Sequence, residues 1–351
     1  MYPYVVHALR WLLGALFLFS GATKSIDPVG TSIFVEKYLS TYALEGLLPA
    51  ALAIGVALAV VEFTVGAMLV GGVMQRRTSL LALVMVALFS VVTLLSATVL
   101  PIGDCGCFGE VVSLTPWGTF VKNVVLLPIA YVVWRGAERR QMKLGDAAIV
   151  VVAIALSLGV NLYAMRHQPL VDLMPYKVGT DLREAVARER MNDDVRSILR
   201  FRNSVTGEVE EFSADATECW MREELEYVDT RTISDATKDA KYADFRLYDA
   251  DGENVSSELL ARSGRVVWLT IYSVDGLKPS HLDAICRLRE AYPMSSIFVL
   301  TADNNLDIEE LGDDTIYNID AMTLRSINRS TVGVVVLNDG VVEYKADIRD
   351  I

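Results

Sequence analysis

The sequence predicts an α-helical membrane bundle followed by an α/β domain in water, and its composition supports this division. Hydrophobic residues make up 52% of the 351 residues. The mean hydropathy of +0.36 is too high for an ordinary soluble protein of this size. Residues 1–164 contain ten Lys/Arg and eight Asp/Glu, whereas residues 165–351 contain 22 and 36. The two parts of the chain therefore face different solvents.

Five apolar stretches are long enough to cross a bilayer core, which requires about 20 helical residues. They lie near residues 5–22, 48–74, 79–100, 117–134 and 145–165. The first stretch has a small-residue segment that looks like a signal cleavage site, but four more spans follow and Arg10 interrupts its apolar run. We therefore expect it to be retained. Thr115 and Pro116 are expected to be the N-cap and first residue of the fourth helix.

The basic residues of the connections predict the orientation, because positively charged connections stay in the cytoplasm. The second and fourth connections together contain Arg76, Arg77, Arg135, Arg139, Arg140 and Lys143. The first contains Lys24 and Lys37, and the third contains none between Pro101 and Pro116. We therefore expect a multi-pass protein of the bacterial inner (cytoplasmic) membrane with a cytoplasmic N-terminus. The third connection and the C-terminal domain are then periplasmic, where disulfides persist.

Four segments are expected along the chain. They are a four-helix membrane bundle (1–140), a fifth transmembrane helix (141–167), a linker and β-hairpin region (168–244) and an α/β domain (245–351). Within the third segment, residues 181–196 read as a surface helix or linker, and residues 198–203 and 208–212 flank a turn in a hairpin pattern.

The last segment contains the sharpest signals for strands. Residues 245–252 read as a strand and turn, and residues 265–272 form the apolar run of a buried strand. A helix from about Ser280 and a strand at 296–301 follow, and residues 332–337 and 341–345 flank an Asp-Gly turn. This order predicts a three-layer α/β domain.

The third connection contains Gly103-Asp-Cys-Gly-Cys-Phe-Gly109, the feature with the clearest chemistry. Cys105 and Cys107 are close enough to form and resolve a mixed disulfide, and a ring this small is easily reduced. A redox function is the first interpretation. The alternatives are a structural disulfide that clips the loop, or two inert thiols. We predict no metal site, because no His or further Cys completes a tetrahedral set.

Two charged residues of the predicted helices are further candidates. Lys122 lies early in the fourth span, where its charge would lower the pKa of a nearby thiol or would simply reach the head groups. Glu62 lies near the middle of the second span, where an ionisable group indicates function by default. It would serve as a proton relay or quinone contact, or pair structurally with Arg10 or a hydroxyl. Cys219 and Cys286 are expected to be buried and unreactive.

Residues 1–135 resemble the DoxX/MauE group of membrane proteins. The resemblance rests on Arg10-Trp-Leu-Leu-Gly14, Phe19-Ser-Gly-Ala-Thr-Lys24, Glu62 before Gly66, and the Asp-Cys-Gly-Cys-Phe-Gly loop, which is typical of the redox-associated MauE-like branch. It implies a four-helix bundle that supports disulfide chemistry in partner proteins, as in the maturation of methylamine dehydrogenase beside a thioredoxin-like protein.

Residues 245–348 resemble the thioredoxin-like fold of the TlpA and peroxiredoxin type, through the pattern from Phe245 to Tyr272. The resemblance fails where the chemistry would lie. The Cys-x-x-Cys window falls on Gly276-Leu-Lys-Pro279, and the usual cis-proline position falls on Val332. A domain without these groups can dock peptides but cannot exchange disulfides.

The sequence therefore predicts a membrane thiol-disulfide protein, a candidate thiol-disulfide oxidoreductase. Its Cys105/Cys107 pair would support the oxidation or maturation of extracytoplasmic protein thiols or of a redox partner protein, with a quinone as the candidate electron acceptor. A non-catalytic scaffold or assembly factor is the alternative. A solute transporter using Glu62 fits less well, because no inverted repeat is evident. The acidic second part argues against nucleic acid and anionic head groups as its partners, while lipid surrounds the bundle.

Overall fold

The computed structural model describes residues 3–99, 115–139 and 141–190, and residues 195–351 apart from short gaps at 205, 214–215, 217–221, 223, 235–241, 243, 293–295, 304–305, 307–310 and 312–314. Its contacts divide the chain into two compact units, Met1–Met174 and Pro175–Ile351. Cys105, Cys107 and Cys219 lie outside the described residues.

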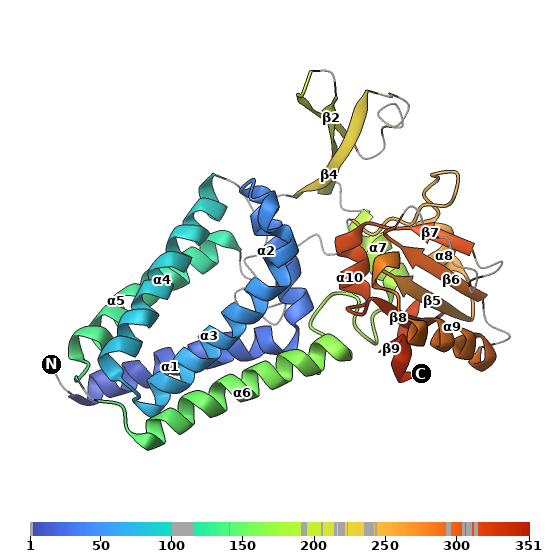
Figure 1. Ribbon diagram of the computed structural model, residues 1–351. Helices are drawn as coiled ribbons and strands as arrows, with labels where there is room; N and C mark the ends of the chain where they lie inside the picture. The colour runs from blue at the N-terminus through green and yellow to red at the C-terminus, as the bar shows by residue number, and fades with distance from the viewer. Residues whose placement is uncertain are drawn as a thin grey trace. The chain divides into compact units, whose positions relative to one another are not determined.

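The first unit consists of helices (Figure 1). They are α1 (Pro3–Ile26), α2 (Pro28–Thr41), the 3-10 helix η1 (Glu45–Ala50), α3 (Ala51–Gly71), α4 (Gln75–Thr98), α5 (Pro116–Gly136) and α6 (Leu144–Arg166). Within the described residues, five helical stretches are long and apolar enough to cross a membrane, and η1 and α3 together form the second of them. The five predicted spans are confirmed, with ends that differ by a few residues. Thr115 caps α5 by accepting a hydrogen bond from the Gly118 amide at 3.1 Å, as expected.

Helices α1 and α3 pack backbone to backbone. A Cβ atom on Gly21 would lie 2.3 Å from the Phe63 nitrogen, and one on Gly66 would lie 2.5 Å from the Leu18 nitrogen. Only glycine permits such an approach, which is typical of helix pairs in membranes. An apolar core that includes Leu13, Leu69 and residues of α4 and α5 extends from this contact. The α1–α3 pair therefore fixes the relative level of every side chain on the two helices.

Helix α2 was not expected, because residues 28–41 were assigned to a connection. Asp27 and Pro28 end α1 and begin α2, with proline in the first turn, where its missing N–H has no helical partner to lose. The first residues of α2 are buried, and Gly55 of α3 lies against Thr31. The first connection is thus largely helical and packed on the bundle.

A three-stranded antiparallel sheet in the order β3-β2-β4 belongs to the second unit. It comprises β2 (Val195–Asn203), β3 (Val209–Ser213) and β4 (Leu225–Ser234). The predicted hairpin is confirmed by the β2–β3 pairing, in which Leu199 faces Phe212. Strand β4 was not predicted. Helix α7 (Leu182–Arg190) confirms the helical alternative for the preceding stretch.

The rest of the second unit is built on a five-stranded sheet in the order β7-β6-β5-β8-β9 (Figure 1). The strands are β5 (Arg265–Ile271), β6 (Ser296–Thr301), β7 (Thr315–Asn318), β8 (Val332–Asn338) and β9 (Val341–Asp347). Strands β5, β6 and β7 are parallel, while β8 is antiparallel to both β5 and β9. The β8–β9 turn at Asp339-Gly340 has positive φ at both residues, which confirms the predicted hairpin.

Helices cover both faces of this sheet. One apolar cluster joins α7, α8 (Ser256–Ala261) and α10 (Ala321–Ile327) to residues such as Trp268 and Val335. A second joins α9 (Pro279–Ala291) and the 3-10 helix η5 (Ile348–Asp350) to residues such as Leu269 and Val334. The predicted three layers are therefore present.

The strand predicted at 245–252 is wrong. Phe245 and Leu247 are buried, which explains the pattern in the sequence, but Tyr248 forms only isolated bridges to Asn254 and Asn318. The apolar alternation of this segment reflects packing beside the sheet and not a strand within it. The turn that follows is present, with the Gly252 amide donating to the Asp249 carbonyl at 3.1 Å.

Candidate functional site

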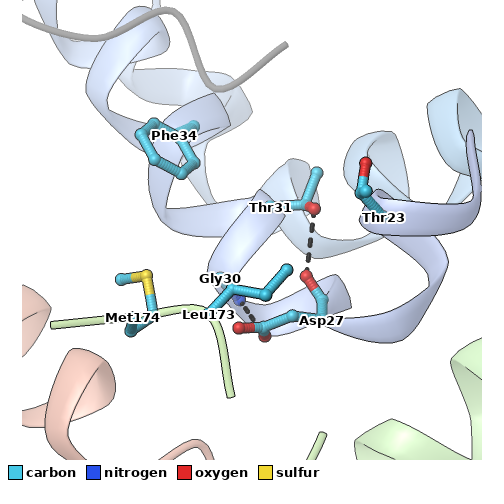
Figure 2. Close-up of a pocket in the computed structure, with 7 residues that line it drawn as sticks. All are labelled: Thr23, Asp27, Gly30, Thr31, Phe34, Leu173 and Met174. Carbon is cyan, nitrogen blue, oxygen red and sulfur yellow. Dashed lines mark hydrogen bonds between the residues drawn. The ribbon is translucent and has the colours of Figure 1, made fainter. Parts of the chain in front are cut away.

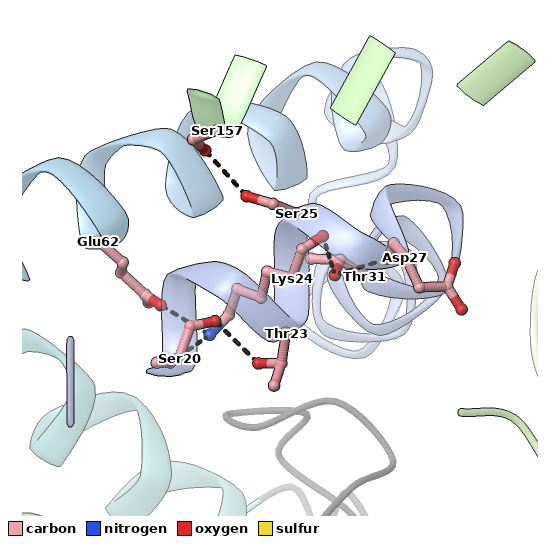
Figure 3. Close-up of polar contacts among 8 residues, drawn as sticks. All are labelled: Ser20, Thr23, Lys24, Ser25, Asp27, Thr31, Glu62 and Ser157. Carbon is pink, nitrogen blue, oxygen red and sulfur yellow. Dashed lines mark hydrogen bonds and ion pairs between the residues drawn. The ribbon is translucent and has the colours of Figure 1, made fainter. Parts of the chain in front are cut away.

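A buried ion pair lies in the helical bundle, between α1 and α3 (Figure 3). The Lys24 Nζ atom lies 2.8 Å from Glu62 Oε2, and the side chains are only 6% and 3% exposed. The same ammonium group donates to the Ser20 hydroxyl at 2.7 Å. The expected partners of Glu62 were Arg10 or a hydroxyl group. Its charged partner is instead Lys24, which lies in the last turns of α1 and not in the first connection.

The local sequence of α1 explains this arrangement. Ser20 and Lys24 are four residues apart, so they lie on the same face of the helix. The close approach at Gly21 brings that face to Phe63, the neighbour of Glu62. Because an isolated charge in an apolar interior is very unfavourable, each residue requires the other.

Polar groups continue from the ion pair to the break between α1 and α2. Asp27 accepts a hydrogen bond from the Gly30 amide at 2.7 Å and thereby caps α2. The Thr31 hydroxyl donates to the Asp27 carbonyl at 3.0 Å, and the Ser25 and Ser157 hydroxyls lie 2.8 Å apart, which joins α1 to α6. The backbone groups released by the break thus find partners within the bundle (Figures 2 and 3).

A small pocket lies beside this cluster (Figure 2). It is lined by Thr23, Asp27, Gly30, Thr31, Phe34, Leu173 and Met174. Its volume is about 10 Å³, close to the minimum for a single water molecule. Glu62 does not line it. The pocket therefore has room for water but not for the ring of a quinone.

Lys122 lies on α5, seven residues after its cap at Thr115 and thus about 10 Å along the helix. The side chain is partly buried. Its neighbour Asn123 donates to the Thr93 hydroxyl at 3.3 Å and joins α5 to α4. Because Cys105 and Cys107 lie outside the described residues, the expected proximity of Lys122 to these thiols stays a prediction.

A contact between α2 and α4 lies at the end of the bundle where the cysteine-containing α4–α5 connection begins. The hydroxyl groups of Tyr42, at the end of α2, and Ser96, in the last turn of α4, lie 3.4 Å apart. Cys105 follows Ser96 by nine residues. The end of α2 is therefore beside the start of this connection. Sequence reasoning missed this relationship because α2 was not expected.

The second unit contains the window Gly276–Pro279 that corresponds to a disulfide-exchange site in the resemblance. Gly276 lies against Thr331, the residue before β8, since a Cβ atom on the glycine would be 2.6 Å from Thr331 Cγ2. Pro279 starts α9, and His281 Nδ1 accepts a hydrogen bond from the Lys278 amide at 3.2 Å. Burial, together with the positive charge of Arg349, lowers the pKa of His281.

Cys286 is exposed and unpaired, so the expectation that it is buried was wrong. It follows the buried residue Ile285 on α9, and its own side chain faces solvent. The apolar stripe of α9 is otherwise as predicted, with Ile285 and Leu288 in the core. Among the described residues, no cluster of three or more His, Cys, Asp or Glu residues is placed to hold a metal ion.

Comparison with known proteins concerns the first unit. Residues 2–135 match the family described as methylamine utilisation protein MauE. No curated protein and no solved structure matches the chain significantly. The family match ends within α5, so it includes the Lys24–Glu62 pair and the Cys-Gly-Cys sequence but neither α6 nor the sheet domain. Together with the five long apolar helices, this similarity supports a MauE-like multi-pass membrane protein.

Proposed function

We propose that the protein is a membrane thiol-disulfide protein that oxidises or matures an extracytoplasmic partner through Cys105 and Cys107. The observation that carries the proposal is the family match over residues 2–135, because it includes the Cys-Gly-Cys sequence between α4 and α5. The family description refers to methylamine utilisation. We extend only the redox context to this chain, and the partner is defined here by its thiols.

The reaction balances as a two-electron exchange. A partner thiolate attacks the Cys105–Cys107 disulfide and forms a mixed disulfide, which releases one loop cysteine as a thiolate. The second partner thiol then attacks the mixed bond, so the partner leaves as a disulfide and the loop is reduced to two thiols. A membrane-borne acceptor of the quinone class takes the two electrons and restores the loop. Lys122 favours the thiolate form through its positive charge.

The proposed orientation is that of an inner-membrane protein with a cytoplasmic N-terminus and a periplasmic second unit. Six basic residues lie in the connections assigned to the cytoplasm. Lys24 no longer counts against this assignment, since it lies within α1 and is paired with Glu62. Among the basic residues counted in the four connections, Lys37 is then the one that this assignment places outside.

We infer a thioredoxin-like role for the second unit as the part that presents or selects the partner. The inference is supported by the order β6-β5-β8-β9, with β5 and β6 parallel and joined by α9, and with β8 and β9 antiparallel. The window at Gly276–Pro279 has no thiol. A binding role without disulfide exchange follows from this combination.

The proposal is tested by trapping the mixed disulfide. We expect Cys105→Ala or Cys107→Ala, but not wild type, to accumulate a reducible adduct of higher mass. In the reverse reaction the remaining loop thiolate attacks the disulfide of the oxidised partner, and the second loop thiol that would resolve the mixed disulfide is missing. The experiment is performed in a Cys219→Ser/Cys286→Ser background, since the exposed Cys286 would otherwise form adducts of its own. Lys122→Ala is expected to weaken the trapping. Absence of adducts in both single variants, with a loop that resists mild reductant, would show a structural clip.

A non-catalytic scaffold is the second candidate, and the thiol-free window of the second unit favours it. The two candidates differ in the outcome of one comparison. Under the first, Cys105→Ala/Cys107→Ala abolishes maturation of the partner in cells. Under the second, that variant is fully functional, whereas deletion of residues 170–351 abolishes the function.

A further inference from the structure

Arg10 is a buried cation without a partner among the described residues. It lies in the third turn of α1 and is 8% exposed. Its Nε and Nη1 atoms are both buried and form no hydrogen bond. A guanidinium group offers five N–H donors, and leaving them unpaired away from water is costly. The geometry therefore calls for an acceptor that the described chain does not supply.

The guanidinium group lies against the turn between α3 and α4. Gly72 has φ of +67°, and a Cβ atom at this position would be 2.4 Å from Arg10 Nη1. Helix α4 begins directly after this turn at Gln75, and its N-cap residue, Met74, provides no side-chain hydrogen bond. The first amides of a 24-residue helix and its positive dipole end are thus beside Arg10.

Gly72 is the C-cap residue of α3, so the negative dipole end of α3 also lies beside Arg10, but no hydrogen bond to Nε or Nη1 is formed there. Arg76 is held elsewhere, since its Nη1 atom donates to the Trp134 carbonyl at 3.3 Å and its guanidinium lies 4.7 Å from the Trp134 ring. Arg77 is exposed on the same turn. The carboxylate of Glu62 is used by Lys24. Among the described residues, no carboxylate forms a hydrogen bond with the Nε or Nη1 atom of Arg10.

The position along α1 indicates where the missing acceptor comes from. Arg10 follows the start of α1 at Pro3 by seven residues, or about 10 Å, which is near the level of lipid head groups at that end of a membrane-spanning helix. An anionic group in this region is carried by phospholipids. Phosphate oxygens match the planar fork of arginine and the free amides of a helix N-terminus.

We propose that Arg10 and the N-terminal turn of α4 bind the phosphate group of an anionic phospholipid. The lipid phosphate accepts hydrogen bonds from the guanidinium and from the first amides of α4. The turn glycine, Gly72, leaves room for the guanidinium. This proposal is independent of the cysteine chemistry.

The test uses the full-length chain and two variants, each of which removes one arginine charge at this end of the bundle. Wild type, Arg10→Gln and Arg77→Gln are reconstituted in nanodiscs of phosphatidylcholine with and without phosphatidylglycerol, and thermal unfolding is followed. We expect phosphatidylglycerol to raise the Tm of wild type and Arg77→Gln but not that of Arg10→Gln. Binding of short-chain phosphatidylglycerol should be at least about tenfold weaker in Arg10→Gln, as expected for lost hydrogen bonds to a charged group.

Three outcomes would overturn the proposal. An equal gain in Arg10→Gln and Arg77→Gln would show unspecific surface attraction, no gain in wild type would show that no lipid site exists, and a full gain from inorganic phosphate alone would assign the site to a free anion. If Arg10→Gln does not fold, native mass spectrometry of wild type decides: retention of phosphatidylglycerol over phosphatidylcholine supports the site, and equal retention contradicts it.

Discussion

Lys24 and Glu62 neutralise each other inside the bundle, with 2.8 Å between the ammonium nitrogen and the carboxylate oxygen. Lys24 approaches from the end of α1, and Glu62 lies near the middle of α3. The pair joins the two helices that are in closest contact. Its polar surroundings continue through Ser20 toward the α1–α2 break. This relationship leads to the first prediction.

Breaking this ion pair should cost more than removing it. We expect Lys24→Met or Glu62→Met alone to lower the free energy of unfolding by about 3–5 kcal/mol, because the remaining charge is buried without a partner. The double variant should recover most of this loss, since methionine has a similar volume and no charge. Unfolding in detergent measures the effect. Lys37→Met, at an exposed position on α2, is the matched control and should be nearly neutral. Additive losses in the double variant would contradict the coupling.

The orientation can be read from chemical labelling of cells. In the Cys219→Ser/Cys286→Ser background, we expect a membrane-impermeant maleimide to reach Cys105 or Cys107 from outside after reduction. A reporter fused after Ile351 should behave as periplasmic. The expectation rests on the distribution of Lys and Arg in the connections. A fusion that is active only in the cytoplasm would reverse the assignment.

The second unit, produced as residues 175–351, should fold without disulfide reductase activity. Its window Gly276–Pro279 contains no thiol, and no other described cysteine lies beside the exposed Cys286 to resolve a mixed disulfide. We expect no turnover in an insulin reduction assay, although Cys286 should react readily with maleimide in the folded domain. Cys286→Ser is the control for this reaction. Activity that disappears in Cys286→Ser would place the active site on α9.

The stability of the same fragment should fall as the pH is lowered below about 6.5, the ordinary pKa of histidine. Burial and the charge of Arg349 lower the pKa of His281 in the folded state, so the unfolded chain binds the proton more readily and acidification favours unfolding. Asp347 and Lys278 also act on this group. His281 is the only histidine of the fragment. Chemical denaturation at a series of pH values measures the effect.

His281→Asn is the variant for this prediction, because its side-chain oxygen can accept the bond from Lys278 and does not titrate. It should flatten the stability profile between pH 6.5 and the lower pKa of His281. The titration of Asp347 does not overlap with this pH range. Burial raises the pKa of Asp347, but hydrogen bonds from Arg349 outweigh burial and lower it, so its contribution is lost only at much lower pH. An unchanged profile in His281→Asn would contradict the assignment.

The sequence allowed the membrane spans and most of the sheet to be predicted, because long apolar runs and the Asp-Gly turn act locally. It did not reveal α2, whose residues 28–41 are mixed in polarity and are buried only through contact with α3. Strand β4 was missed because Glu226, Asp229 and Arg231 interrupt its apolar residues. Conversely, the pattern of Phe245 and Leu247 predicted a strand that is absent, because these residues pack beside the sheet.

The candidate site was predictable in its parts but not in its pairing. Glu62 was singled out because a carboxylate in an apolar span is unusual, whereas Lys24 was assigned to a connection because the apolar run seemed to end at residue 22. Only the packing of the helices shows that Lys24 reaches Glu62. The four-residue spacing of Ser20 and Lys24 was the signal available for extending the helix. The burial of Arg10 is likewise a property of the tertiary structure.

The glycine contacts between α1 and α3 have a consequence for motion in the membrane. Gly21 and Gly66 hold the two helices so closely that neither can slide or rotate without collision of their backbones. The two helices therefore move as one rigid unit, and the Lys24–Glu62 ion pair links them. We therefore expect any rearrangement that accompanies function to occur outside this pair, for example in the α4–α5 hairpin, whose connecting sequence contains both loop cysteines.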